Sequence, residues 1–330
     1  MDTSDPDIGF DDAGVCNHCR LYDTLVREHL FERPEAERRL AGIVAAIKEA
    51  GKGKPYDCVI GVSGGVDSTY VAYHVKKLGL RPLAVHLDNG WDSELAVKNI
   101  ETTLKKVGID LETHVLDWEE FRDLQLSFLK ASSPDSEIPT DHAIMAVLHQ
   151  TARRLGLRYV VTGFNVRTES HMPRAWSQGH ADWKYIRSVQ RQFGRLRLRT
   201  FPHTSLATAY YNRATQRWVH ILNYLDYSKP EALRVLQEEL GWRFFGGKHS
   251  ESIYTRFYQG YILPVKFGYD KRRSHLSSLI CSGEMTRDAA LQELDKPTYQ
   301  PSMQEEDREY VVKKLSLSDD EFEAILNAPK

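Results

Sequence analysis

The sequence predicts an α/β fold with a doubly wound, mainly parallel sheet. Between residues 55 and 163, short apolar segments alternate with amphipathic segments of helix length. Connections of this length between successive strands are typical of βαβ units, whose strands run parallel and carry helices on the faces of the sheet. The apolar segments that we expect as strands are 58–62, 82–88, 111–116 and 158–162.

The amphipathic segments between these strands have the spacing of helices. Apolar residues recur every three or four positions in 93–107, 118–130 and 141–155, which places them on one helical face. Ser93 can cap the first of these helices, and Gly108 follows its end. The alternation of strand and helix therefore continues through this whole part of the chain.

Composition divides the chain into three parts. Residues 1–54 carry a cysteine pair and a charged helical stretch, and we predict a zinc-binding segment there. Residues 55–205 are the predicted nucleotide-binding α/β domain, which ends in an irregular excursion rich in Arg, Trp and His. Residues 206–330 are predicted to be mainly helical and to complete the active site.

The overall composition limits the classes of function. The chain has 330 residues, 41% hydrophobic content and a formal net charge of −2, so its global charge gives no reason to expect nucleic acid. No stretch approaches the ~20 apolar residues that span a bilayer, and the acidic N-terminus lacks a signal-peptide pattern. We expect a cytoplasmic protein without nucleic-acid or membrane partners, with homo-oligomerisation left open.

A glycine-rich turn joins the first predicted strand to a helix. Its residues are Ser63, Gly64, Gly65, Val66, Asp67 and Ser68. Paired glycines let the backbone approach phosphate oxygens, and the helix N-terminus presents further N–H donors to an anion. Asp67 is placed to hold magnesium, and the spacing differs from GxxxxGK[ST]. A simple glycine turn is the alternative. We predict a nucleotide phosphate site.

This SGGVDS loop resembles the pyrophosphate loop of the PP-loop ATP pyrophosphatases, which cleave ATP between the α- and β-phosphates. In that superfamily an acidic residue after the fourth strand often joins the loop aspartate on Mg²⁺, and Glu169 is the natural candidate; a solvated loop glutamate is the alternative. Asp88 ends the second strand and can contact the nucleotide, or simply form a turn. Thr162, Gly163 and Asn165 follow the fourth strand and are expected beside the nucleotide.

The chain has four cysteines. Cys16 and Cys19 form a C-x₂-C unit, one half of a typical zinc site, and Cys281 can supply a third ligand. Cys58 begins a buried strand and is expected to be an inert core thiol. We predict a structural zinc site; reactive thiols for sulfur transfer, or no role, are the alternatives. The candidates for the fourth ligand are His18, His249 and His275.

Two basic stretches of the C-terminal part, 246–257 and 263–273, can interact with phosphates. Within them, Lys248 or Arg256 is predicted to stabilise charge on the transferring phosphoryl group. Lys271 and Arg272 are predicted to contact the nucleotide. Clusters of this kind are also common on solvated surfaces, which is the alternative for all four residues.

Several motifs together resemble the N-acetyl sugar amidotransferase family of bacterial surface-polysaccharide (lipopolysaccharide O-antigen) biosynthesis. They are FDDAGVCNHC, VIGVSGGVDSTY, GKHSESIYTRF and LPVKFGYDKRRSHLSSLICSGEMTR. The resemblance implies conversion of an acetamido group on a nucleotide-linked sugar to an acetamidino group. It also implies ammonia from a separate glutaminase. Residues 171–240 match no motif of the family.

The residues agree with ammonia supplied from outside. A class II glutaminase needs an N-terminal cysteine, whereas position 2 is Asp2, and the chain has no room for a class I domain. An amide oxygen is a poor leaving group, so we expect ATP to convert it to an O-adenylyl imidate with release of pyrophosphate. Ammonia then displaces AMP.

Two rival functions remain open at this stage. A PP-loop tRNA-modifying enzyme, either a thiolase or a lysidine-type ligase, can use Cys16 and Cys19 and bind RNA through the Arg-rich stretch 187–199. A non-catalytic adenine-nucleotide-binding module has a similar topology but does not need Asp67. A synthetase that makes an amide rather than an amidine is a further enzymatic alternative.

Overall fold

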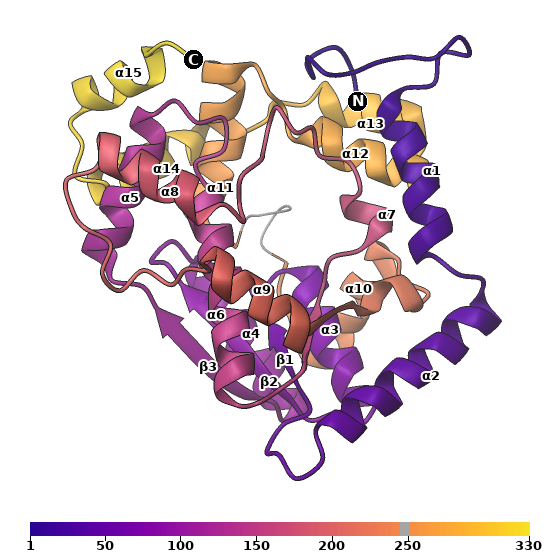
Figure 1. The fold of residues 1–330 in the computed structure, drawn as a ribbon. Helices are drawn as coiled ribbons and strands as arrows, with labels where there is room; N and C mark the ends of the chain where they lie inside the picture. The colour runs from indigo at the N-terminus through magenta and orange to yellow at the C-terminus, as the bar shows by residue number, and fades with distance from the viewer. Residues whose placement is uncertain (245–250) are drawn as a thin grey trace.

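The computed structural model describes residues 1–244 and 251–330. Within these residues the sheet has five parallel strands in the order β3-β2-β1-β4-β5. Figure 1 shows this sheet in the lower half of the molecule, surrounded by helices. The strands are β1 (Cys58–Gly61), β2 (Pro82–Asp88), β3 (Asp110–Val115), β4 (Tyr159–Thr162) and β5 (Arg217–His220).

Strands form at each of the four predicted segments, which confirms the prediction of a parallel α/β fold. The edge strand β5 lies outside that prediction, and it pairs with β4 from Tyr159↔Arg217 to Thr162↔His220. Its sequence, RWVH, is too short to show a periodic pattern. The strand order also reverses direction at β1, between β2 and β4. Ligands of open α/β sheets bind at such a switch point.

Helices cover both faces of the sheet, so the sheet is doubly wound. On one face, α2 (Arg33–Ala50), α3 (Val66–Lys77) and α4 (Glu94–Val107) share an apolar core with Ile60. On the other face, α6 (Ile138–Arg154) packs against Val59. Successive residues of β1 thus enter opposite cores, as the period of two along a strand requires.

A second apolar core lies away from the sheet and is built from helices. Its aromatic centre includes Phe121, Phe128, Tyr254, Phe257 and Tyr258, each 1% exposed or less. These residues come from segments before and after position 205, which Figure 1 shows together at the upper left. The helices that surround this core are α5 (Trp118–Lys130), α8 (Trp183–Phe193), α11 (Ile253–Phe257), η3 (Tyr258–Phe267), α14 (Pro301–Lys314) and α15 (Asp319–Asn327).

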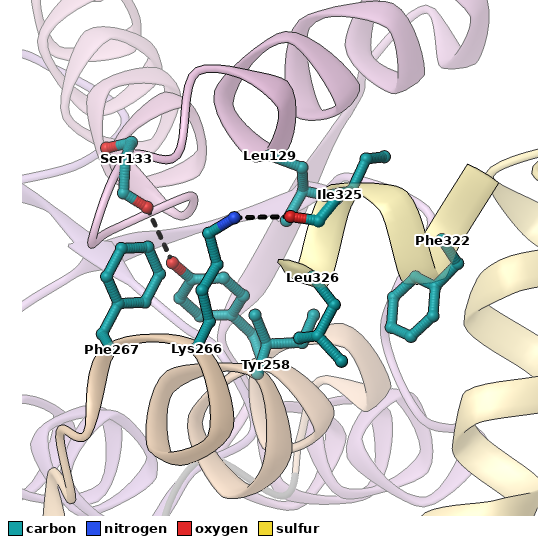
Figure 2. Close-up of a pocket in the computed structure, with 9 residues that line it drawn as sticks. Leu129, Ser133, Tyr258, Lys266, Phe267, Phe322, Ile325 and Leu326 are labelled. Atoms are coloured by element: carbon teal, nitrogen blue, oxygen red, sulfur yellow. Dashed lines mark hydrogen bonds between the residues drawn. The ribbon is translucent and has the colours of Figure 1, made fainter. Parts of the chain in front are cut away.

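The cation of Lys266 closes the C-terminal end of this helical core. Its Nζ donates to the carbonyl oxygen of Ile325, near the end of α15 (Figure 2). It also donates to the carbonyl oxygen of Ala328, which follows the helix. Carbonyls at the end of a helix lack intrahelical donors. A lysine there donates hydrogen bonds to them, and its positive charge interacts favourably with the negative end of the helix dipole. The cavity beside Lys266 holds only about 10 Å³, and we therefore regard this region as a packed core.

The remaining elements connect the sheet to its surroundings. α1 (Asn17–His29) packs against α7 (Val166–Glu169) and α12 (Arg272–Cys281), and Figure 1 shows these three on the right of the molecule. The others are α9 (Leu206–Thr215), η1 (Ile221–Tyr224), α10 (Lys229–Val235), η2 (Leu236–Leu240) and α13 (Arg287–Leu294). None of the helices in the described part of the chain is long and apolar enough to cross a bilayer.

Candidate active site

The SGGVDS loop lies at the switch point of the sheet, between the end of β1 and the start of α3. Gly64 has a φ of +79°, in the region that favours glycine. A Cβ on Gly64 would lie 2.8 Å from the carbonyl oxygen of Ala96, so this position has neither the conformation nor the space for a side chain. The sharp turn therefore depends on glycine at this position.

The hydroxyl groups of the loop are held close together. Ser63 Oγ and Ser68 Oγ are 3.2 Å apart, and the backbone N–H of Gly65 donates to Ser63 Oγ at 3.3 Å. Trp242 also holds the loop, because its Nε1 donates a hydrogen bond to the Gly64 carbonyl oxygen at 2.8 Å. The Trp242 contact is absent from the sequence prediction because it joins positions 178 residues apart. The hydroxyls and the loop backbone face one small region, as an anion site requires.

The residues after β4 meet the loop from the neighbouring strand. A Cβ on Gly163 would lie 3.0 Å from the Asp67 carbonyl carbon and 3.1 Å from Ser68 N, so the two backbones are in close contact. Asn165 is fully buried and caps α7 through the N–H of Thr168 at 3.0 Å. Thr162 Oγ1 forms a hydrogen bond with His220 on β5 at 2.9 Å. Gly163 is thus beside the loop, whereas the side chains of Asn165 and Thr162 are used within the protein.

A cavity of about 630 Å³ opens next to the loop. This volume is in the range of small-molecule sites in proteins. Lys229 and Glu251 are among its lining residues and were not among the predicted site residues. Lys229 lies in no motif, whereas Glu251 lies within GKHSESIYTRF, for which the sequence singled out the cations only. The lining residues are Ser63, Gly65, Val66, Asp67, Ser68, Gly163, Glu169, Lys229, Leu233, Trp242, Phe244, Glu251, Met285 and Glu293.

Asp67 and Glu169, the two predicted magnesium ligands, line the same cavity. The phenol of Tyr227 donates a hydrogen bond to Asp67 Oδ1. Burial, and then the negative charges of Asp67 and Glu169, raise the pKa of Tyr227 far above its usual range. The phenol therefore stays protonated and acts as a donor to Asp67. Carboxylates on one cavity wall are the ligands that a hard cation prefers, so this pair fits Mg²⁺.

The predicted cations of the C-terminal part lie elsewhere. Arg256 forms a two-point ion pair with Asp307, at 2.6 and 2.7 Å, and is not among the residues that line the cavity. Arg272 is paired with Asp270 at 2.7 Å and donates to the carbonyl oxygens of Glu293 and Lys296. Both arginines thus contact carboxylates or carbonyl oxygens of the same chain, and neither lines the cavity. Lys248 lies outside the described residues.

Lys271 belongs to a buried polar cluster near the start of α6. Its Nζ lies 3.7 Å from Asp135 Oδ2. Burial opposes ionisation, yet Lys271, His180 and Ser177 together lower the pKa of Asp135 to about 2. Burial raises the pKa of the neighbouring Glu137 to about 7, although Lys271 acts in the opposite direction. The structure thus pairs Lys271 with acidic groups, and it does not place this lysine on the cavity wall.

Asp88 does not line the cavity either. Its Oδ1 accepts from the N–H of Gly90 at 2.8 Å, which is the turn-forming alternative. Instead, His86 on the same strand supports the loop. His86 Nδ1 lies 2.9 Å from the carbonyl oxygen of Val62, and Nε2 lies 3.1 Å from Asp92. The histidine thus connects β2 to the residue immediately before Ser63.

The cysteines of the predicted zinc site lie near one another. Cys16 Sγ and Cys19 Sγ are 3.5 Å apart, and Cys281 is a hydrogen-bond neighbour of Cys19. Among the described residues, however, no group of three or more His, Cys, Asp or Glu is already arranged to hold a metal ion. Cys58 is fully buried in the sheet, as predicted. Of the predicted fourth ligands, His18 is paired with Asp5 at 2.6 Å, and His249 lies outside the described residues.

The comparisons with known proteins give a family for the C-terminal part. Residues 251–330 match a family model described as LPS biosynthesis protein WbpG-like, C-terminal domain. The chain is also 24% identical over 266 residues to the uncharacterized protein MJ1599 of Methanocaldococcus jannaschii, and this alignment covers 78% of each protein.

The comparison with solved structures finds two synthetases at low TM-scores. NMN synthetase from Francisella tularensis is 18% identical, over 42% of this chain and 56% of that one, with a TM-score of 0.30. An NH3-dependent NAD synthetase from Campylobacter jejuni is 14% identical, over 89% of this chain and 98% of that one, with a TM-score of 0.36.

The five-stranded parallel sheet, with helices on both faces and the SGGVDS loop at its switch point, is the doubly wound α/β fold that the sequence predicts. Over residues 251–330, the match to a family of LPS biosynthesis proteins agrees with the polysaccharide-biosynthesis family that the sequence motifs resemble.

Proposed function

We propose that the protein is an AMP-forming amidotransferase that converts the acetamido group of a nucleotide-linked sugar to an acetamidino group. The observation that carries this proposal is the cavity at the SGGVDS loop, with Asp67 and Glu169 on its wall, in a chain that carries a WbpG-like C-terminal domain. The remaining steps follow from the chemistry of the amide group.

The loop would bind the phosphates of ATP. Backbone N–H groups at the start of α3 and the hydroxyls of Ser63 and Ser68 can donate to the β- and γ-phosphates, which leave as pyrophosphate. Asp67 and Glu169 would hold Mg²⁺, which neutralises charge on the leaving group when bound. Lys229 lies in the first turn of α10 and on the cavity wall, so its ammonium group can interact with these phosphates.

The substrate must be activated because an amide oxygen does not leave as hydroxide at neutral pH. We propose that this oxygen attacks the α-phosphate of ATP, forming the O-adenylyl imidate while the bond to pyrophosphate breaks. The loop contributes by holding the α-phosphate and the acetamido oxygen in line, since positioning supplies most of the catalysis in such transfers.

Ammonia completes the reaction. It adds to the imidate carbon, loses a proton, and the C–O bond to AMP breaks, which leaves the amidine. A nitrogen nucleophile that arrives as NH₃ needs little activation. We propose that a separate glutaminase protein supplies it. Zinc takes no part in these steps, because the cysteines lie outside the cavity of the loop.

A sulfur-transferring tRNA enzyme is the rival that the structure disfavours. Such an enzyme needs a reactive thiolate. Burial and the neighbouring Cys16 and Cys281 sulfurs raise the pKa of Cys19 to about 12, so this thiol is protonated at neutral pH when no cation is present. The surroundings of Cys19 are therefore not those of a sulfur carrier, in which nearby cations stabilise the thiolate.

The test is a turnover assay with ATP, MgCl₂, ammonium chloride and a panel of UDP-linked acetamido sugars, read by mass spectrometry. AMP and pyrophosphate should appear together with a sugar in which NH replaces oxygen. AMP formation without a changed sugar would retain the ATP chemistry and redirect the search to other acceptors. If no acceptor gives AMP even when glutaminase and glutamine are added, the enzymatic proposal is rejected in favour of a nucleotide-binding module.

A further inference from the structure

Three cysteines and one histidine from three distant segments lie in successive contact beside α1. Cys16 and Cys19 stand at the start of α1, Cys281 is the last residue of α12, and His171 follows the end of α7 by two positions. All four cysteines of the chain are free of disulfides. His171 was not among the histidines considered from the sequence. It lies in the stretch that matches no motif, and only the fold brings it to the cysteines.

The contacts among these side chains have the length of contacts between ligands of one zinc ion. Cys16 Sγ lies 3.5 Å from Cys19 Sγ, and Cys281 Sγ lies 3.8 Å from His171 Nε2. In a tetrahedral site with Zn–S of about 2.3 Å and Zn–N of about 2.0 Å, neighbouring donor atoms are about 3.5–3.8 Å apart. A disulfide would bring two sulfurs to about 2.0 Å, which the cysteine pair does not approach.

The His171 ring is oriented as a metal ligand is. Its Nδ1 lies 3.0 Å from Ser278 Oγ, on α12, and its backbone N–H donates to the same oxygen at 3.2 Å. When Nδ1 carries the proton and donates to Ser278, the lone pair of Nε2 faces Cys281. Histidines that bind metals usually donate their other ring N–H to such a partner. His171 is only 2% exposed, and the ring of Tyr22 stacks on it.

We propose that Cys16, Cys19, Cys281 and His171 form a Cys₃His zinc centre that joins the N-terminal segment to α7 and α12. The described side chains are not yet arranged around one point, so binding draws the cysteine pair and the Cys281–His171 pair onto a common ion. Two thiolates or more balance the Zn²⁺ charge as their protons are released.

The zinc centre also bears on the active site. His171 is two residues beyond Glu169, and α7 packs against both α1 and α12. Zinc would therefore fix the end of the short helix that carries Glu169 to the cavity wall. His171 is in this sense a positioning residue, because it lies outside the residues that line the cavity.

The first test is the metal content of the full-length protein, purified without chelator and measured by elemental analysis. We expect about one zinc per chain. After replacement by Co²⁺, the visible absorption should show the intense bands of tetrahedral cobalt together with thiolate-to-cobalt charge transfer. Absence of zinc in the purified protein, combined with no cobalt spectrum after reconstitution, would reject the site; recovery of a Cys16–Cys19 disulfide would do the same.

Variants then identify the fourth ligand. His171→Ala should lower zinc affinity by 100-fold or more, and Ser278→Ala by about 10–100-fold, since it removes only the partner of the ring. His171→Cys should keep the metal with a cobalt spectrum shifted toward that of four thiolates. His18→Gln and Cys58→Ala are matched controls that should bind zinc normally. If His171→Ala does not fold, the comparison of wild type with His171→Cys still decides. An unchanged cobalt spectrum in His171→Cys would overturn the assignment.

Hydrogen exchange tests the link to α7 without any assay of activity. Removal of zinc by a chelator should raise exchange in residues 1–20 and 166–171, and leave the strands β1 to β3 unchanged. Exchange that rises uniformly, or only in residues 1–20, would contradict the positioning role. Because none of these readouts requires turnover, they stand or fall independently of the proposed reaction.

Discussion

The loop cavity and the basic C-terminal segments contain the same kinds of polar groups but use them differently. At the loop, the hydroxyls of Ser63 and Ser68 contact mainly each other and their own backbone, beside an open cavity. In the C-terminal part, Arg256 and Arg272 are engaged with carboxylates and carbonyl oxygens of the same chain. A site that binds a ligand needs hydrogen-bond donors that folding does not use. We infer that backbone N–H groups of the loop, at the cavity, are such donors.

The difference shows what a sequence pattern can establish. SGGVDS prescribes a local backbone shape, so its position after a strand indicates both its geometry and its use. A run of cationic residues does not determine a local backbone conformation. The acidic groups and carbonyls that its side chains contact depend on the tertiary fold. We therefore expect substitutions in the loop to lower turnover, and substitutions in the arginine clusters to lower the free energy of unfolding.

The largest effect is expected at Asp67. Asp67→Asn keeps the size of the side chain and an oxygen that can accept from Tyr227, but it removes the charge that would hold Mg²⁺. We expect AMP formation to fall about 1,000-fold with little change in melting temperature. The control is Asp110→Asn, at the opposite end of the sheet, which should turn over normally. Retained turnover in Asp67→Asn would remove the magnesium role.

At Arg256 we expect a loss of stability without a loss of chemistry. Arg256→Met removes the cation paired with Asp307, which is 5% exposed and keeps the phenol of Tyr299 as a hydrogen-bond donor. Removing one member of a buried ion pair lowers the free energy of unfolding by about 3 kcal/mol. Urea denaturation of the variant and the wild type would measure this loss. The double variant Arg256→Met, Asp307→Asn should recover part of this loss. A variant that unfolds like the wild type but forms less AMP per folded molecule would place Arg256 in the active site. It would contradict the structural role of this arginine.

The sequence gives more of the fold than of the site. The strands from β1 to β4 and the loop were predictable because each has a local pattern: an apolar run, a glycine pair, a capped helix. β5 was not, since four residues of an edge strand carry no periodic signal. Tyr227, Trp242 and His171 escaped prediction for a related reason. Each contacts its partner across more than 100 positions of sequence, and no local sequence pattern indicates the contact.

The buried Glu137 predicts a pH dependence of stability. Burial raises its pKa to about 7, from 4.5 in the unfolded chain. The folded state thus holds a proton that the unfolded state has lost between these pH values. Its stabilising contribution is complete below about pH 4.5 and is lost as the pH rises through about 7, a change of about 3 kcal/mol.

Glu137→Gln should remove this dependence, because an amide does not titrate. Denaturation curves from pH 4 to pH 8 should then become flatter for the variant than for the wild type. Glu137 also accepts from Thr255 and Gln259, so the comparison concerns the slope with pH and not the absolute stability. A parallel slope in the two proteins would show that Glu137 is ionised in the folded state.

The smallest effect is expected from Gly64→Ala, which tests the loop as a backbone shape. The φ of +79° and the Ala96 carbonyl oxygen, 2.8 Å from the added Cβ, should cost about 1–2 kcal/mol of stability. Gly42→Ala, within α2 and with open space around it, is the matched control and should be slightly stabilising. Turnover should fall in the first variant alone. Since the substitution removes no polar side chain, such a fall would show that the loop acts through its backbone.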